Sequence, residues 1–385
     1  MTRTWILASL PWILGPLIMF WRARGSPDLA DEPDEIPPAP PLVSVIVPAR
    51  NEAHNIERCV RSLLSSGWPS LEVIVVDDRS EDATGSLVRA LGAEDARVRV
   101  IDGAPVPSGW FGKQWACAQG ASAARGSTLI FTDADTAHAP TLIPRSMSAM
   151  RARALDFLTV GGFQELGSFW ERVVMPQVFY MIATRYGGAG AVNRARRSRD
   201  KIANGQYMCF TRACYDAIGG HESVRGKAAE DLALAQLVHA RGMRGEIVIG
   251  EHELSTRMYT SLKEVVNGWT KNMVTAGADT LPAGIIPRLL LPVLLLVAPL
   301  MHLAPPVTLL ASLLVPVARG VVMWAAVCSA LLLVWWAFIY VRVFRQPPWY
   351  ALTLPLGAMI VLFIIARATV RGRGVEWKGR RYQAG

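Results

Sequence analysis

Hydrophobic residues are concentrated at the two ends of this chain. Residues 4–21 include no charged side chain, and a helix of this length is about 27 Å long, close to the thickness of the bilayer core. Between residues 289 and 366 the chain is again overwhelmingly apolar, with three arginines as its only formally charged residues. These patterns predict an N-terminal transmembrane anchor at 1–21 and a C-terminal transmembrane region at 289–366.

Basic residues indicate how the chain is oriented in a membrane. Arg22 and Arg24 follow the first span, and residues 367–385 form a basic tail with one acidic residue, Glu376. The positive-inside rule places both flanks in the cytoplasm, so the number of C-terminal crossings should be even. We therefore predict an integral protein of the bacterial cell (inner) membrane whose water-soluble middle faces the cytoplasm.

The C-terminal region is difficult to divide into spans. Stretches 320–341 and 349–366 are each long enough to cross a bilayer. The earlier stretch, 289–318, is interrupted by Pro305 and Pro306, which indicates two short spans or one span with a re-entrant piece. We expect four C-terminal crossings rather than two.

Between the membrane regions, short β-branched runs alternate with stretches of helical periodicity. Before them lies a Pro-rich and acidic linker, 22–41, which we expect to be extended and semi-rigid. The alternation predicts parallel βαβ units with right-handed crossovers, and hence an α/β domain with a Rossmann-like, mostly parallel sheet over 42–288. The predicted strands are 42–48, 71–76, 98–101 and 127–132, and the predicted helices are 52–65, 82–91 and 114–124.

Polar loops follow three of the predicted strands. Residues 49–52 follow the first strand, Asp77 and Asp78 end the second, and Asp133 and Asp135 follow the fourth. Ligands of parallel sheets bind beyond the carboxyl ends of the strands, so these loops should meet at one edge. The first strand is not followed by G-x-G-x-x-G, which argues against a dinucleotide-binding dehydrogenase.

Asp133 and Asp135 are the candidate metal ligands. Two carboxylates at this spacing can hold Mg²⁺ or Mn²⁺, cations that prefer oxygen ligands and also bind diphosphate oxygens. An acidic loop that caps the next helix is the alternative, but the position at a buried strand end favours the metal. We expect His138 to be a surface or capping residue rather than a third ligand.

Other polar residues each have a structural and a functional interpretation. Asp77 and Asp78 could accept hydrogen bonds from a nucleobase or ribose, or cap the following helix. Lys113, before a helix, could meet a phosphate or lie at the surface. Glu230 and Asp231 start an apolar helical pattern, where acids are common, or supply a general base.

Composition narrows the class of protein. The chain has 385 residues, of which 51% are hydrophobic and 18% charged, so it is neither disordered nor collagen-like. Its five cysteines form no C-x-x-C pair, which argues against a disulfide framework or a zinc site. The formal charge of +9 fits contact with anionic membrane lipids, whereas clustering of basic residues at the membrane ends gives little support for a nucleic-acid partner.

Four segments, taken in order, resemble the signature of family-2 glycosyltransferases with the GT-A fold. They are VSVIVPARN at 43–51, VIVVDDRSED at 73–82, TDAD at 132–135 and the pair at 230–231. The resemblance covers about residues 42–272. It is closer to membrane-anchored members similar to hopene-associated and carotenoid-acid glycosyltransferases, through GWFGKQWACAQG at 109–120, DADTAHAP at 133–140, SFWERVVMP at 168–176, GWTKN at 268–272 and EWKGRRY at 376–382.

The resemblance implies an inverting transfer of a single sugar. A nucleotide-sugar donor would be held by Asp77, Asp78 and Lys113, with a Mg²⁺ or Mn²⁺ at Asp135 and Asp133. Asp231 would be the base and Glu230 its supporting neighbour. Further donor contacts would come from Pro48, Arg50, Asn51, Glu52 and Asp133, and weaker candidates for acceptor or diphosphate contacts are Gly205, Gln206, Trp269 and Lys271.

One departure from the family concerns processive synthesis. Processive polysaccharide synthases carry Q-x-x-R-W after the base, whereas residues 265–269 here are VVNGW and keep only the tryptophan. This argues against a processive synthase. The resemblance and the membrane anchors instead imply a lipid acceptor, such as a hopanoid, carotenoid or polyprenyl compound. A processive synthase of the same fold is the alternative, and a non-catalytic membrane scaffold with a degenerate nucleotide-sugar site is a weaker one.

Two further segments have predictions of their own. Residues 168–186 are apolar but too short to span a bilayer, so they form either an interfacial helix or a buried helix of the domain. Residues 187–203 are rich in Gly and Arg and are expected to form a mobile basic loop.

Overall fold

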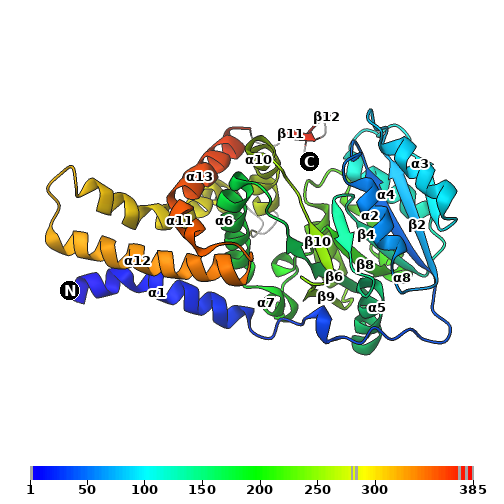
Figure 1. Cartoon of the computed structure of the whole chain (residues 1–385), viewed down its shortest axis with the longest axis horizontal. Helices are drawn as coiled ribbons and strands as arrows, with labels where there is room; N and C mark the ends of the chain where they lie inside the picture. Colours follow the sequence, from blue (N-terminus) through cyan, green and yellow to red (C-terminus); the bar gives the residue numbers. More distant parts are fainter. Residues whose placement is uncertain (1–2, 279–280, 282–284, 372–373, 378–379, 384–385) are drawn as a thin grey trace. The chain divides into compact units, whose positions relative to one another are not determined.

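The structure is a computed structural model of the chain, and it describes residues 3–278, 281, 285–371, 374–377 and 380–383. The chain forms two compact units (Figure 1). We call them the sheet unit and the helical unit. The sheet unit comprises Gly25–Glu165, Ala189–Met258 and Arg373–Gly385, and the helical unit comprises Met1–Arg24, Leu166–Gly188 and Tyr259–Gly372.

A seven-stranded sheet with the order β3-β2-β1-β4-β8-β6-β9 organises the sheet unit. Only β8 among these strands runs antiparallel to its neighbours, so the predicted mostly parallel α/β fold is confirmed. A smaller sheet has the order β5-β10-β7. The strands are β1 (Val43–Ala49), β2 (Leu71–Asp77), β3 (Val98–Asp102), β4 (Thr128–Thr132), β5 (Thr136–His138), β6 (Phe157–Gly161), β7 (Phe163–Gln164), β8 (Tyr207–Thr211), β9 (Gly245–Ile249) and β10 (Leu254–Thr256).

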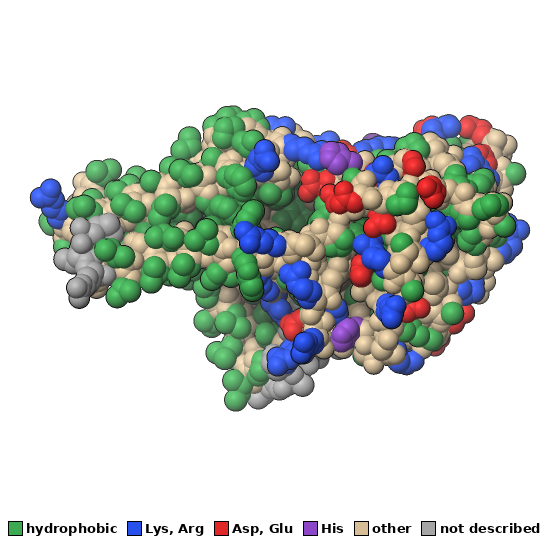
Figure 2. Space-filling model, turned by 90° about the horizontal axis from the view of Figure 1, so that it is seen from below, with side chains coloured by type: hydrophobic (Ala, Val, Ile, Leu, Met, Phe, Trp, Pro, Cys, Tyr) green, Lys and Arg blue, Asp and Glu red, His purple; other side chains and the backbone are tan. Residues whose placement is uncertain are grey.

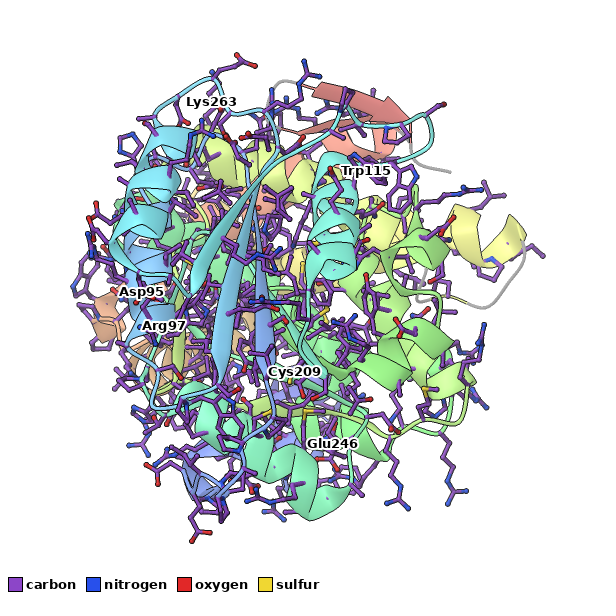
Figure 3. All side chains as sticks on the ribbon, turned by 90° about the vertical axis from the view of Figure 1, so that its right-hand side faces the viewer. Asp95, Arg97, Trp115, Cys209, Glu246 and Lys263 are labelled. Carbon is purple, nitrogen blue, oxygen red and sulfur yellow. The ribbon has the colours of Figure 1, made fainter. Side chains whose placement is uncertain are left out.

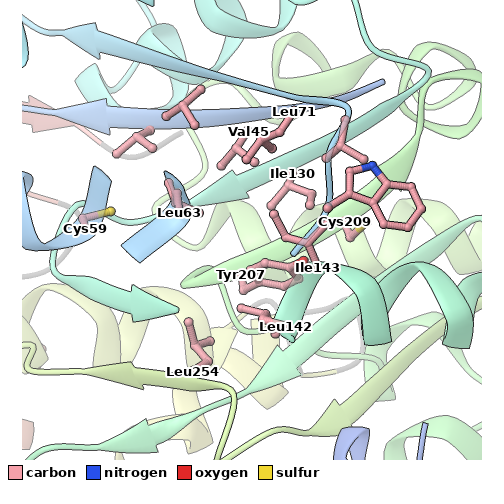
Figure 4. Packing of buried hydrophobic residues seen from close by; sticks show 14 of the residues in the cluster. Val45, Cys59, Leu63, Leu71, Ile130, Leu142, Ile143, Tyr207, Cys209 and Leu254 are labelled. Carbon is pink, nitrogen blue, oxygen red and sulfur yellow. The ribbon is translucent and has the colours of Figure 1, made fainter. Parts of the chain in front are cut away.

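Hydrophobic side chains cover both faces of the central strands. On β1, Val45 packs in one cluster with residues of α2 (Ile56–Leu64) and α5 (Leu142–Arg153), as Figure 4 shows, while Ile46 packs in another with α4 (Gly112–Ala123). Burial on both faces explains why β1 and β2 are continuous apolar runs rather than alternating ones. The remaining helices of this unit are α3 (Thr84–Glu94), α7 (Ala189–Arg194), α8 (Arg212–Ala217) and α9 (Glu230–Ala240).

The linker packs on the sheet unit and is not a free spacer. Leu29 is completely buried, and the backbone N–H of Ile249 in β9 donates to the carbonyl oxygen of Pro27 at 2.8 Å. Residues 25–41 are therefore part of the sheet unit, which differs from the extended linker that the sequence predicts.

The helical unit contains the described helices that could cross a membrane. Judged by length and composition, these are Thr4–Ala23, Leu289–Ala311, Arg319–Arg342 and Pro348–Arg371. Figure 2 shows apolar side chains gathered over the surface of these helices. The helices of the unit are α1 (Arg3–Ala23), α6 (Phe169–Tyr186), α10 (Leu262–Ala278), α11 (Ile285–Ala311), α12 (Arg319–Arg342), η4 (Pro348–Thr353) and α13 (Leu354–Arg371).

The expectation of four C-terminal crossings is wrong for the described residues, which contain three candidate spans. The doublet of Pro305 and Pro306 lies inside α11 and does not divide it. A proline removes one backbone donor, and such local losses are tolerated in apolar helices whose neighbours compensate for them. Three is an odd number, so these helices alone do not give the even number of C-terminal crossings that the positive-inside rule requires.

Two segments of the expected domain belong to the helical unit and not to the sheet unit. α6 and α10 are parts of the helical unit, so the contiguous boundaries 42–288 do not match the compact units. α6 begins with a capping box between Ser168 and Glu171 and buries Val173 and Val174, which agrees with the interpretation as a buried helix. The expected basic loop at 187–203 instead contains α7 and a short 3₁₀-helix at Ser198–Asp200.

Candidate active site

The loops after β1 and β2 are joined at the carboxyl edge of the sheet. The buried guanidinium of Arg50 donates to the carbonyl oxygens of Asp78 (2.8 Å) and Arg79 (2.7 Å) and pairs with Glu81 (2.9 Å). Asn51 has a φ of 52°, a left-handed conformation that asparagine tolerates well, and its side-chain oxygen accepts from the backbone of Glu81 at 2.8 Å. Arg50 and Asn51 therefore shape this edge rather than extend freely from it.

Asp77 and Asp78 are buried at the end of β2. Asp77 Oδ1 accepts from the backbone N–H of Ser80 at 3.0 Å, so its carboxylate stabilises the turn that follows the strand. The backbone N–H of Asp78 donates to the carbonyl oxygen of Ala49 at 2.8 Å and continues the pairing of β1 with β2. Pro48 lies within β1, and Glu52 hydrogen-bonds Thr84 through its backbone N–H at 2.8 Å.

Lys113 joins two carboxylates from distant parts of the sequence. Its Nζ lies 2.7 Å from Asp133 Oδ1 and 3.0 Å from Glu230 Oε1. Lys113 lies in the first turn of α4, Asp133 follows β4 and Glu230 starts α9, so three elements converge here. Burial alone would lower the pKa of Lys113, but the charges of Asp133 and Glu230 raise it well above its usual value, so Lys113 stays cationic.

Asp135 has the buried oxygen expected of a metal ligand. Its Oδ1 is buried without a hydrogen-bond partner, and burial together with the charges of Asp133 and Glu52 raises the pKa of Asp135 to about 8. Burial raises the pKa of Asp133 as well, against the effect of Lys113. No group of three or more His, Cys, Asp or Glu residues among the described ones is arranged to hold a metal. Asp133 and Asp135 would therefore need further ligands from the substrate or water.

Asp231 is held in place by backbone donors. Oδ2 accepts from the N–H of Gly205 at 3.1 Å, and Oδ1 accepts from the N–H of Leu232 at 2.8 Å. Burial, and then the neighbouring charge of Glu230, raises the pKa of Asp231 to about 6. A carboxylate with this pKa can take up a proton near neutral pH, as a general base must.

Gly205 lies against Asp231, and Gln206 follows it just before β8. A Cβ on Gly205 would lie 3.0 Å from Asp231 Oδ2, so a side chain there would press on the carboxylate. The side-chain oxygen of Gln206 accepts from Gln164 Nε2 at 2.9 Å, and its backbone oxygen accepts from Thr132 Oγ1 at 2.7 Å.

Trp269 and Lys271 belong to the helical unit. Both lie on α10, and the indole of Trp269 is buried, with Nε1 3.1 Å from Met175 Sδ and the ring edge-on to Phe179. The sheet unit alone therefore does not bring them to Asp133 and Asp231.

His138 is a buried structural residue, not a surface one. Nδ1 is 2.9 Å from Ser62 Oγ, and Nε2 is 2.9 Å from Thr132 Oγ1. Burial lowers its pKa to about 3, so the imidazole is neutral. The strand-end position alone does not reveal this burial, because it depends on α2 packing over β5.

His221 was not predicted from the sequence. It is buried against Phe131, with ring centroids 4.6 Å apart, and accepts or donates a hydrogen bond at Tyr215. Burial lowers its pKa to about 4; the charge of Glu230 opposes this effect, and the charge of Lys113 adds to it. A lone histidine nine residues before α9 gives no sequence signal of this position.

Comparisons with known proteins show which proteins the chain resembles. Residues 44–210 match the family model described as Glycosyl transferase family 2. Proteins named 4,4'-diaponeurosporenoate glycosyltransferase are similar to the chain: that of Staphylococcus haemolyticus (strain JCSC1435) is 26% identical over 245 residues, and that of Staphylococcus aureus (strain MRSA252) is 26% identical over 254 residues. Each match covers 62% of this chain, and the chain spans 63% of the length of these relatives.

A solved structure shares the fold. It is a mannosyltransferase from Pyrobaculum calidifontis in complex with GDP-Man and Mn²⁺, with a TM-score of 0.56 and 19% sequence identity. The match covers 95% of this chain and 97% of that chain. At this identity the likeness concerns the fold.

Proposed function

Because residues 44–210 match the family-2 glycosyltransferases and the fold is GT-A, we propose that the chain transfers a single sugar from a nucleotide-sugar donor to a membrane lipid, with inversion at the anomeric carbon. The observation that carries this proposal is the convergence of Lys113, Asp133 and Glu230, next to Asp231, at the carboxyl edge of the sheet. The cation Lys113 suits a diphosphate leaving group, and a carboxylate beside it suits removal of a proton from the acceptor.

Asp231 is the proposed base. Its carboxylate would remove the proton of the acceptor hydroxyl or acid as the oxygen attacks the anomeric carbon. Hydrogen bonds from Gly205 and Leu232 fix its orientation, and Glu230 raises its pKa while pairing with Lys113.

The donor would lie against the ends of β1, β2 and β4. Asp77 and Asp78 would meet the nucleoside, Pro48, Arg50, Asn51 and Glu52 would shape the adjoining edge, and Lys113, which pairs with Asp133, would meet the diphosphate. Asp135 and Asp133 would hold Mg²⁺ or Mn²⁺, for which the partnerless oxygen of Asp135 provides a fitting ligand. When bound, the cation would offset negative charge that develops on the leaving diphosphate.

The helical unit supports a lipid acceptor. Four described helices are long and apolar enough to cross a membrane, which would keep the enzyme where lipids are concentrated. The similar staphylococcal proteins are named for a carotenoid acid. The proposed acceptor is therefore a carotenoid-, hopanoid- or polyprenyl-like lipid. The sheet unit would lie on the cytoplasmic side of the cell membrane.

The test measures nucleoside diphosphate release from a panel of nucleotide sugars. Full-length protein is incubated with a membrane lipid extract and Mn²⁺ or Mg²⁺, with chelator and with lipid-free samples as controls. We expect release from one donor that requires both metal and lipid, and one added sugar per labelled lipid. Long saccharide products would instead favour a processive synthase, and metal-dependent nucleotide binding without turnover would favour a non-catalytic scaffold.

A further inference from the structure

A pocket lies at the edge of the sheet opposite to the candidate active site, and its volume is about 380 Å³. Its lining includes Phe157 and Gly245, the first residues of β6 and β9, which pair in parallel. Because β6 and β9 run in the same direction as β1 and β4, the pocket lies at the amino ends of the strands. Figure 3 shows this separation, with Glu246 of β9 and Trp115 of α4 at opposite ends of the sheet.

A buried ammonium group lines this pocket. Lys201 is 8% exposed, and its Nζ donates to the carbonyl oxygens of Val192 (3.0 Å) and Asn193 (2.9 Å), which uses two of its three N–H groups. Burial lowers the pKa of Lys201, and the charge of Glu246 opposes this only in part, so the protein environment disfavours the bare ammonium charge. An anion that accepts from the third N–H would relieve this cost.

The other charges leave the pocket cationic. Glu246 is the only carboxylate among the described lining residues, and it lies 3.4 Å from Arg153, which also pairs with Glu32 at 3.2 Å. Arg153 is therefore balanced by two carboxylates. Lys201 and the exposed guanidinium of Arg244 remain to meet a ligand.

An apolar wall adjoins these cations. Val238 and Ala235 are buried on α9, and Phe157 is buried at the start of β6. A volume of about 380 Å³ lies within the range of small-molecule sites, and a mixture of apolar wall and a few cations suits an organic phosphate.

We propose that this pocket binds a phosphate-bearing ligand, with the phosphate held between Lys201 and Arg244 and the organic part against Val238. The phosphate could come from a soluble compound or from an anionic lipid headgroup, and the experiment below separates the two. α9 carries Glu230 and Asp231 at its first turn and the pocket wall at its last turns, so ligand and base lie at the two ends of one helix of about 16 Å.

The test follows the binding of two phosphate probes to the full-length protein in detergent micelles. One arm titrates inorganic phosphate at constant ionic strength, and the other adds short-chain phosphatidylglycerol, with diacylglycerol of the same chain length as the phosphate-free control. Saturable binding is read by calorimetry and by the shift in melting temperature. A response to both probes supports a soluble phosphate ligand, and a response to phosphatidylglycerol alone supports a lipid headgroup.

Variants connect the binding to this pocket. We expect Lys201→Met and Arg244→Gln to weaken binding at least tenfold, and Arg196→Gln, which removes an exposed arginine outside the lining, to leave it unchanged. Lys113→Met removes the proposed diphosphate contact of the donor site and should also leave it unchanged. If Lys201→Met does not fold, Ala235→Leu fills the pocket while every charge is kept, and it must weaken binding too.

Three outcomes would overturn the proposal outright, and a fourth would assign the phosphate to another site. The three are no saturable response of the unaltered protein to either probe, an equal loss of binding in Arg196→Gln, and full binding in both Arg244→Gln and Ala235→Leu. Loss of binding in Lys113→Met would assign the phosphate to the donor site instead, and would equally exclude this pocket.

Discussion

At the scale of the residue, the proposed base is testable with a near-isosteric change. Asp231→Asn keeps the size of the side chain but cannot take up a proton, so we expect the transfer rate to fall about 10²- to 10⁴-fold. Donor binding should change little, because Asp231 faces the acceptor in this proposal. The measurement is kcat for sugar transfer together with donor affinity, and Asp216→Asn, an exposed aspartate, is the matched control. Full activity of a folded Asp231→Asn protein would show that Asp231 is not the base.

The raised pKa of Asp231 leads to a separate prediction for the pH dependence of transfer. The base works in its ionised form, and its pKa is about 6 rather than the usual value near 4. The rate should therefore fall about tenfold per pH unit below pH 6, in a range where an ordinary aspartate would still be ionised. Steady-state kinetics between pH 5 and 8 at saturating metal check this, and a flat profile down to pH 5 would contradict it.

Asp135 is the residue on which metal dependence should rest. Asp135→Asn replaces one charged oxygen ligand, so Mn²⁺ should strengthen nucleoside diphosphate binding less than it does in the unaltered protein. We expect the affinity measured with Mn²⁺ to fall at least about tenfold, or ~1.4 kcal/mol. Calorimetric titration with and without Mn²⁺ measures it. Binding without metal is the internal control, and an unchanged metal effect would place the cation elsewhere.

Single residues also show what the sequence can and cannot predict about the site. Asp133, Asp135 and Asp231 are recognisable because each carboxylate stands at a strand end or a helix start. The bridge from Lys113 to Asp133 and Glu230, and the close approach of Gly205 to Asp231, depend on packing between elements far apart in the chain. Such packing leaves no pattern in a single sequence.

At the scale of the element, α4 is the helix whose fit most directly positions a site residue. A Cβ on Gly120 would overlap Ile46 Cγ2 and lie 3.2 Å from Val76 Cγ2, so glycine lets α4 lie close to β1 and β2. Gly120→Ala should cost about 1–3 kcal/mol and lower the melting temperature by several degrees. The control is Gly67→Ala, where a Cβ would meet Pro140 O at an ordinary 3.7 Å. Equal melting temperatures for both variants would contradict the close fit.

Elements with a strong local pattern were predicted well. The first four strands of the sheet and the three helices between them agree with the structure to within a few residues, because apolar runs and helical periodicity are local signals. β6, β8 and β9 carry weaker patterns and were not predicted. β8 runs antiparallel to both β4 and β6, and a strand's own residues do not indicate the direction in which it pairs.

At the scale of the whole molecule, the segment between α1 and β1 helps to hold the sheet unit together. Leu29 is fully buried in the main hydrophobic cluster, so Leu29→Ala should cost about 2–5 kcal/mol. Thermal unfolding and limited proteolysis of the full-length protein measure this loss. Ile36→Ala, at a residue of the same segment that is 43% exposed, should have little effect, and a stable Leu29→Ala protein would show the segment to be a mere spacer.

The division into units could not be predicted from the order of the elements along the chain. Contiguity suggested one domain from 42 to 288, whereas α6 and α10 belong to the helical unit. Charge counting and the proline doublet suggested four C-terminal crossings, but prolines inside α11 do not end it. The first error arises because local composition does not say which neighbours an apolar helix will pack against, and the second because prolines can lie inside an apolar helix.

The inserted helix α6 also has a consequence for the order of synthesis. α6 packs against α13, and Gln177 Nε2 donates to the carbonyl oxygen of Leu354 at 2.9 Å, yet roughly 170 residues separate the two helices. At about 5–20 residues per second, α6 leaves the ribosome roughly 10 to 30 seconds before its partner. During that interval the sheet unit can complete most of its strands, while the newly made apolar face of α6 depends on the membrane or on a chaperone for cover.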